Sequence, residues 1–148
     1  MRINVGINPE LLSDEHLLAE EREIAMVPGT FKRIGDKDVP PVMNLGKGYI
    51  KFFMDKAEYT LDRYMLVHNE CLRRGFLPKD KSHLWFGVNM KSNPFEYGER
   101  EINLIKNRII DKTRKSPKEY FHYNGTRDSK INVITRLNID FEKSLQKD

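Results

Sequence analysis

The stretch Ser13–Glu23 reads SDEHLLAEERE and predicts the first helix of the chain. Its serine is a favourable N-cap, because a serine hydroxyl accepts a hydrogen bond from a backbone N–H of the first turn. Asp14 and Glu15 follow, where negative charge meets the positive end of the helix dipole. Apolar residues give this helix a buried side, and Pro28-Gly29 is expected to end it. We therefore expect one helix from about Asp14 to Met26 or Val27.

Polar side chains share one face of this predicted helix. His16, Glu20 and Glu23 fall at positions i, i+4 and i+7, and Arg22 lies about one residue's rotation away. Titratable groups are thus concentrated in two helical turns, close in sequence to an α-amino group. We interpret this stretch as a candidate active site, and a merely solvated helix face is the alternative.

Length and composition predict one folded domain. The chain has 148 residues, of which 39% are hydrophobic and 32% charged, which suffices for one core and a solvated surface. Cys71 is the only cysteine, so no disulfide can form within the chain. A reducing, cytoplasmic setting fits best. No apolar run approaches a membrane span and no signal-peptide pattern is seen, so we expect no membrane contact. We also expect a monomer.

The charge is distributed unevenly along the chain. Residues 1–46 carry 5 Lys/Arg and 8 Asp/Glu, a net charge of −3, whereas residues 47–148 carry 21 and 14, a net charge of +7. A basic remainder of this kind suits a polyanionic partner such as nucleic acid. A solvated surface with chance asymmetry is the alternative, because the excess is modest.

Two further helices follow from apolar periodicity. Residues 50–72 repeat apolar side chains at i, i+3, i+4 and i+7, with His68 as a core histidine, and Arg73-Arg74-Gly75 ends the pattern. Gly46-Lys47-Gly48 precedes it without the spacing of a phosphate-binding Walker loop, and either makes a tight turn or admits a phosphate near Lys47. In the irregular stretch 77–98, Trp85 and Phe86 are expected to reach the core.

The third helix is predicted over residues 99–113. Its later part is basic, and Arg108, Lys112 and Lys115 share one face. An aromatic cluster within residues 117–125 follows it directly. A basic face beside aromatic rings suits nucleic-acid binding by stacking or wedging, but the same rings can equally close the core.

The last segment shows a different period. Apolar residues occupy odd positions from Ile131 to Phe141, which predicts a strand. The alternating N-terminal residues Ile3, Val5 and Ile7, or a second copy of the chain, could pair with it. The sequence therefore predicts an all-α, compact three-helix single domain with long loops and a possible strand-like C-terminal extension.

The sequence resembles the pyrimidine-dimer DNA glycosylase/AP lyase family, the phage-type endonuclease V of ultraviolet-damage repair. The resemblance spans residues 2 to about 125 and divides the chain into a glycosylase-like domain, 1–125, and an extension, 126–148. It is carried by Arg2-Ile3-Asn4, His16-Leu17-Leu18-Ala19-Glu20, Arg22-Glu23, Leu45-Gly46, Gly48, Phe52-Phe53, Asp55-Lys56, Glu70-Cys71-Leu72, Arg74-Gly75-Phe76, Arg108, Lys112 and Pro117 with the aromatic cluster after it.

The resemblance implies an enzyme that acts on damaged double-stranded DNA without a cofactor. The α-amine of Met1 would attack the sugar C1′ of the damaged nucleotide, and Glu23 would be the essential carboxylate. A Schiff base would form, and β-elimination would then nick the strand. If the source is viral, the setting is the host cytoplasm. The resemblance also implies that Arg2, His16 and Arg22 contact DNA or the site. It implies that Arg108 and Lys112 contact phosphates. We add Lys47 as a candidate DNA contact.

Two alternatives to this enzyme remain open. The first is a non-catalytic DNA-binding protein that keeps the same fold. The second is a metalloprotein in which His16, Glu20 and Glu23 ligate a divalent ion, although no second cluster at matching spacing supports it. We therefore expect no metal.

Overall fold

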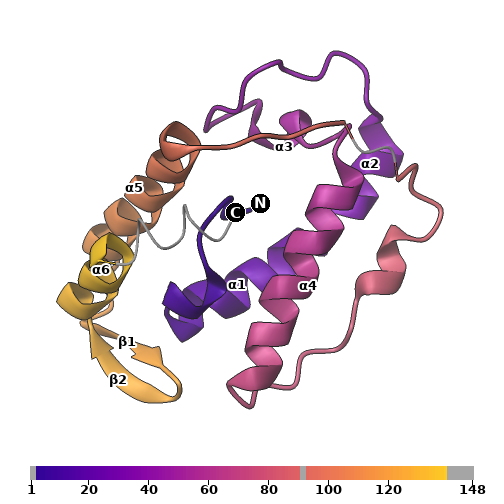
Figure 1. The fold of residues 1–148 in the computed structure, drawn as a ribbon. Coiled ribbons are helices and arrows are strands. Elements are labelled where there is room, and N and C mark those ends of the chain that lie inside the picture. The colour runs from indigo at the N-terminus through magenta and orange to yellow at the C-terminus, as the bar shows by residue number, and fades with distance from the viewer. Residues whose placement is uncertain (1–2, 91–92, 140–148) are drawn as a thin grey trace. The chain divides into compact units, whose positions relative to one another are not determined.

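The computed structural model describes residues 3–90 and 93–139, and the side chains of these residues up to 138. The chain forms two compact units. The first contains Ile3 and Glu20–Glu96, and the second contains Asn4–Ala19 and the chain from Tyr97 onward. Helix α1 (Asp14–Ile24) begins in the second unit and ends in the first. Figure 1 labels the helices and strands of both units. The boundary predicted at residue 125 lies inside the second unit.

Helix α1 begins as the sequence predicts, but it ends earlier. The backbone N–H of His16 donates to Ser13 Oγ at 3.2 Å, which confirms Ser13 as the N-cap. The predicted single helix to residue 27 is wrong, because α1 stops at Ile24 and α2 (Val27–Ile34) follows after a short turn. Pro28 lies in the first turn of α2, where its missing N–H costs no helical hydrogen bond. Gly35, with a φ of 66°, ends α2.

The predicted helix over residues 50–72 is also divided. Helix α3 (Tyr49–Phe52) is followed by a turn, and α4 (Ala57–Arg73) then continues the periodic pattern. Phe52, Phe53 and Met54 are all buried, and three consecutive residues cannot face one core from a single helix. Lys56 closes the turn by donating from Nζ to the carbonyl of Phe52 at 3.0 Å.

In the described part of the stretch 77–98, the short 3-10 helix η2 (Ser82–Trp85) lies in the first unit. Trp85 is buried and donates from its indole N–H to Thr60 Oγ1 at 3.1 Å, so the prediction for this residue is confirmed. The prediction for Phe86 is wrong, because 78% of its surface is exposed. His68 is 4% exposed and lies on the inner side of α4, as predicted.

The second unit contains η1 (Pro9–Leu11), α5 (Glu99–Lys115), a hairpin of β1 (Tyr120–Tyr123) and β2 (Thr126–Ser129), and α6 (Lys130–Ile139). Helix α5 confirms the predicted third helix. The two strands are antiparallel, with Tyr123 opposite Thr126. Asn124 and Gly125 form the turn, both with positive φ, which is the dipeptide that tight hairpins prefer. The chain is therefore mostly helical but not purely all-α.

The strand predicted from Ile131 onward is wrong. The described part of this segment forms α6, which buries Val133 and Leu137 and leaves Ile131 75% exposed. Val133 and Leu137 are four residues apart, a spacing that places them on one helix face. The apolar pattern of this segment is compatible with both the strand period and the helix period. The segment forms a helix that packs against α5. Phe141 lies outside the described residues.

The N-terminal residues of the described chain are buried on more than one side. Ile3, Asn4, Val5 and Ile7 are all at most 2% exposed, whereas an extended segment with one buried face was expected. Gly6 has a φ of 73°, and a Cβ built on it would lie 2.5 Å from Ile102 Cγ1. A glycine is required here because both the backbone conformation and the close approach of α5 exclude a side chain.

Candidate active site

The start of α1 is attached to the hairpin within the second unit. Asp14 accepts hydrogen bonds from the backbone N–H groups of Asn124 and Gly125 at 3.0 and 2.8 Å. Glu15 accepts from the backbone N–H of His122 at 2.8 Å and lies 2.7 Å from its Nδ1. Burial tends to raise the pKa of Glu15, but the His122 hydrogen bonds outweigh it and lower the pKa. The two acids that follow the N-cap therefore position the hairpin.

The aromatic cluster after α5 is divided between the interior and the surface of this unit. Phe121 is 4% exposed, and its ring lies 5.2 Å from that of His16. Tyr123 donates to the carbonyl of Glu10 at 2.7 Å, and Arg136 covers its ring at 4.0 Å. The alternative in which these rings close the core is correct for Phe121. Tyr120 is 37% exposed and carries Arg127 over its ring at 4.2 Å.

His16 is built into the same cluster. It is 9% exposed, and its Nδ1 lies 3.0 Å from Ser13 Oγ. One ring nitrogen and one ring face are thus engaged by Ser13 and Phe121. A role for His16 toward DNA stays a prediction.

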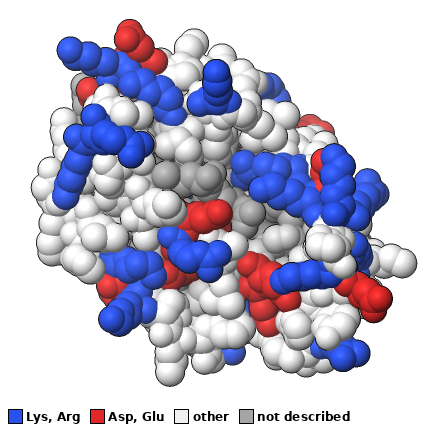
Figure 2. All heavy atoms as spheres, turned by 180° about the vertical axis from the view of Figure 1, so that it is seen from behind, with Lys and Arg blue, Asp and Glu red and all other residues white. Residues whose placement is uncertain are grey.

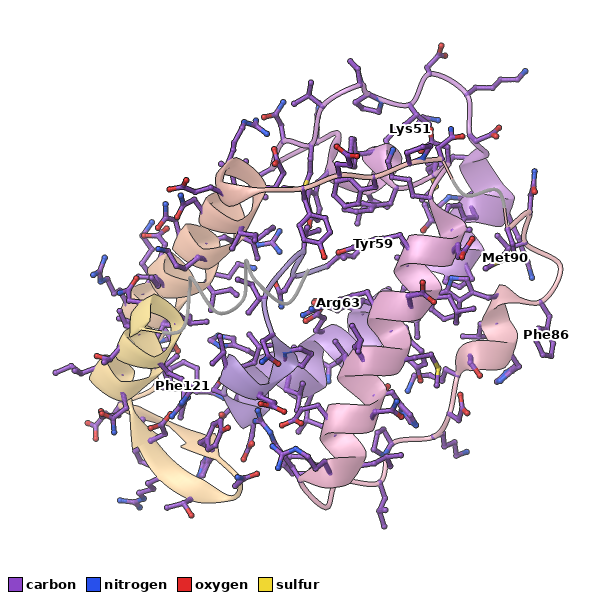
Figure 3. The ribbon with its side chains drawn as sticks, viewed as in Figure 1. Lys51, Tyr59, Arg63, Phe86, Met90 and Phe121 are labelled. Carbon is purple, nitrogen blue, oxygen red and sulfur yellow. The ribbon has the colours of Figure 1, made fainter. Side chains whose placement is uncertain are left out.

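Glu20 is paired inside the first unit. Arg63 of α4 donates from Nε and Nη2 to the two oxygens of Glu20 at 2.8 and 2.9 Å, and the two side chains are 4% and 0% exposed. Figure 3 shows Arg63 and Tyr59 extending from α4. Both oxygens of Glu20 are therefore bound by Arg63, whereas the metal hypothesis needs Glu20 as a ligand of the ion. Within the described chain, no three His, Cys, Asp or Glu side chains are grouped to hold a metal ion.

Glu21 is likewise buried, at 2% exposure. Nothing in the sequence distinguishes it from the neighbouring acids of α1 that are less buried. Lys81 Nζ donates to its carboxylate, and His68 Nδ1 lies 3.8 Å from it. Tyr64 accepts from the backbone N–H of Lys81 at 2.9 Å. Burial raises the pKa of the Tyr64 hydroxyl to about 12, so this phenol stays neutral at any ordinary pH. The cluster fastens the segment before η2 to α1 and α4.

Arg22 and Glu23 are the predicted site residues at the end of α1. Arg22 is exposed and Glu23 is partly exposed, and both belong to the first unit. Ile3 belongs to the same unit, and its carbonyl accepts a hydrogen bond from the Tyr49 hydroxyl. The chain that follows the N-terminus is therefore held at Ile3 by α3. Met1 and Arg2, the predicted nucleophile and its neighbour, lie outside the described residues.

The remaining predicted contacts are divided between the units. Lys47 is exposed in the loop before α3, in the first unit. Arg108 and Lys112 lie one helical turn apart on α5, in the second unit. Arg108 is half-buried and donates from Nη2 to Asn4 Oδ1 at 3.0 Å, which holds the buried N-terminal segment. Lysine and arginine side chains cover several parts of the face in Figure 2, with acidic ones between them.

Sequence reasoning missed two features of this region. The Glu20–Arg63 pair joins residues 43 positions apart, and no local pattern marks Arg63 as its partner. The hairpin had a signal, because Asn124-Gly125 between aromatic and β-branched residues is typical of a two-residue turn. Both features engage residues of the predicted polar face, because Arg63 binds Glu20 and Phe121 of the hairpin packs against His16.

A mostly helical, basic chain that presents an arginine and a glutamate from its first long helix fits the class of helical proteins that act on nucleic acid. Comparison with known families defines the class more closely. Residues 1–84 match the family model of pyrimidine dimer DNA glycosylases, and the chain belongs to this family. The family consists of DNA glycosylases that act on damaged DNA. The matched residues include α1 to α4, and the hairpin and α6 lie beyond them.

Among the described residues, no helix has both the length and the apolar character that crossing a membrane demands.

Proposed function

We propose that this chain is a DNA glycosylase with AP-lyase activity, which uses the N-terminal α-amine as its nucleophile. The observation that carries the proposal is the family match, which covers the N-terminus and the whole of α1. Its support in the structure is that Ile3 and Glu23 belong to one unit, with Ile3 held by Tyr49. We further propose that the protein acts as a monomer in the cytoplasm, on damaged duplex DNA.

An α-amine suits this chemistry better than a lysine does. Its pKa of about 7.7–8.0 leaves on the order of 10% unprotonated at neutral pH, whereas a lysine with a pKa of about 10.4 offers far less. The neutral nitrogen attacks C1′ of the damaged nucleotide. The C1′–N bond to the base breaks, and the base leaves with the bonding electron pair and a proton.

Strand cleavage follows from the covalent intermediate. Opening of the sugar ring gives a protonated Schiff base between the amine nitrogen and C1′. Loss of the C2′ proton then expels the 3′-phosphate as the C3′–O bond breaks, and water releases the sugar and restores the amine. We assign to Glu23 the stabilisation of the cationic sugar and the movement of the proton. No step requires a metal ion or a cofactor.

Recognition would use cationic side chains. Arg2, Arg22, Lys47, Arg108 and Lys112, together with His16, are the residues we propose to contact DNA. Flipping a nucleotide out of the duplex costs a few kcal/mol and costs least at a damaged base, which contributes to selectivity.

Borohydride trapping tests the proposal. The protein is incubated with duplex DNA that carries an abasic site or a cyclobutane dimer, borohydride is added, and the adduct is mapped by mass spectrometry. An adduct on the N-terminal peptide supports the lyase, and the intact mass identifies the residue that bears the amine. No adduct on either DNA, with tight duplex binding retained, favours the non-catalytic DNA-binding protein instead.

A further inference from the structure

Phe86 is the most exposed aromatic side chain among the residues that the structure describes, with 78% of its surface accessible. Figure 3 shows it on the outer side of the loop after η2, pointing away from α4. The neighbouring residue is the opposite case, because Trp85 is 2% exposed. An exposed phenylalanine beside a buried tryptophan requires an explanation, since burial of its ring would stabilise the fold.

The backbone around Phe86 is held on both sides. The N–H of Phe86 donates to the carbonyl of His83 at 2.9 Å, and the N–H of Val88 donates to the carbonyl of Trp85 at 3.1 Å. The Trp85 indole is bonded to Thr60, and its ring lies 5.2 Å from that of Tyr64. Phe86 is therefore a protruding ring on a fixed base, so little conformational entropy is lost when it inserts into a partner.

Cations lie on the elements that surround the loop of Phe86. The residue after it, Gly87, lines a small surface pocket together with Lys32 of α2. Lys32 and Arg33 are both exposed in the last turn of α2, which packs against η2. Lys79, before η2, is exposed as well, while Asp36 and Asp80 are the nearby acids. An exposed apolar ring on a loop whose neighbouring helix ends in exposed cations fits duplex DNA, which has charged phosphates outside and stacked bases inside, better than it fits an apolar protein surface.

We propose that Phe86 is a wedge that enters the base stack of duplex DNA, with Lys32 and Arg33 on the flanking phosphates. The inference rests on the proposed function for the identity of the partner. Apolar side chains inserted at a base step unstack the bases and kink the duplex. Such insertion is easiest beside a lesion, where stacking is already weakened. Lys81 joins the same loop to Glu21 of α1, so the wedge is coupled to the helix that carries Glu23.

Fluorescence of 2-aminopurine placed next to a tetrahydrofuran abasic analogue tests the wedge, because the analogue resists the lyase. The unmodified protein should raise the fluorescence several-fold on binding. Phe86→Ala should abolish this rise and weaken binding about tenfold, the loss expected for one stacked base. Phe86→Leu should retain most of the rise. Leu77→Ala is the matched control, because Leu77 is an 89% exposed apolar residue of the same unit.

The outcomes separate this inference from the proposed function. If the unmodified protein forms no borohydride adduct with a natural abasic site, the lyase proposal fails while the fluorescence still reports on the wedge. If Phe86→Ala keeps the fluorescence rise, or if the unmodified protein produces none, the wedge is refuted. A change of sedimentation by Phe86→Ala without a change in DNA binding also refutes it, because the ring would then contact a second copy of the chain.

Discussion

Arg63 and Glu20 form a buried bidentate ion pair, with N–O distances of 2.8 and 2.9 Å, that joins α4 to the end of α1 inside the first unit. Both side chains are almost fully removed from solvent. Removing one partner leaves an uncompensated charge in the interior. The pair therefore fixes the part of α1 that carries Arg22 and Glu23.

Breaking this pair should destabilise the fold strongly. We expect Glu20→Gln and Arg63→Met each to lower the free energy of unfolding by about 3–5 kcal/mol, measured by urea denaturation. The double variant should recover part of the loss, because it buries no unpaired charge. Asp111→Asn breaks the exposed pair with Lys115 and is the control, with an expected loss below about 1 kcal/mol. A single variant at residue 20 or 63 with the stability of this control would contradict the argument.

Glu23→Gln separates catalysis from binding. The variant should retain its affinity for abasic duplex DNA and lose at least about 100-fold in strand nicking, the lower end of the contribution of a general acid or base. Glu58→Gln, an exposed acid of α4 in the same unit, should nick at the unchanged rate. Persistent nicking by Glu23→Gln in a gel assay would show that another group carries the role.

Stability should depend on pH through Glu15. Its pKa is lowered in the folded protein, so its contribution is fully present above the ordinary value of 4.5 and is lost as the pH falls through the folded pKa. Other carboxylates titrate in the same range, so the comparison is with Glu15→Gln. The difference in unfolding free energy between the two proteins should shrink from pH 7 to pH 3.

The control for this pH series is Glu119→Gln, which removes an exposed acid just before β1. Its difference from the unmodified protein should stay constant across the series. A constant difference for Glu15→Gln as well would mean that the contact with His122 does not stabilise the carboxylate.

A methyl group at Gly6 should not be tolerated. Gly6→Ala places its Cβ 2.5 Å from Ile102 Cγ1 at a φ of 73°, and we expect a loss of about 1–3 kcal/mol in thermal or urea unfolding. Gly29→Ala is the matched control, because nothing lies within 4 Å of its Cβ and it belongs to α2. Alanine is the better helix former, so this control should be neutral or up to about 1 kcal/mol more stable. Equal stabilities of the two variants would contradict the close packing at Gly6.

Local sequence determined the parts of this protein that depend on neighbouring residues. The N-cap at Ser13, the apolar period of α4 and the whole of α5 follow from side chains within a few positions of each other. The family was also readable from the sequence, because most of the motifs that resemble it lie within residues 1–84, which the family model matches. The placement of the implied catalytic pair, Met1 and Glu23, remains a prediction.

Tertiary packing decided what local patterns left open. The pattern from Ile131 satisfies both a strand and a helix, and burial of Val133 and Leu137 selected α6. The run Phe52-Phe53-Met54 divided the second predicted helix, because three adjacent side chains became buried together. Glu20 pairs with Arg63, which lies 43 positions away in the sequence. Such choices depend on which distant surfaces exclude water together, and that information lies in the folded chain as a whole.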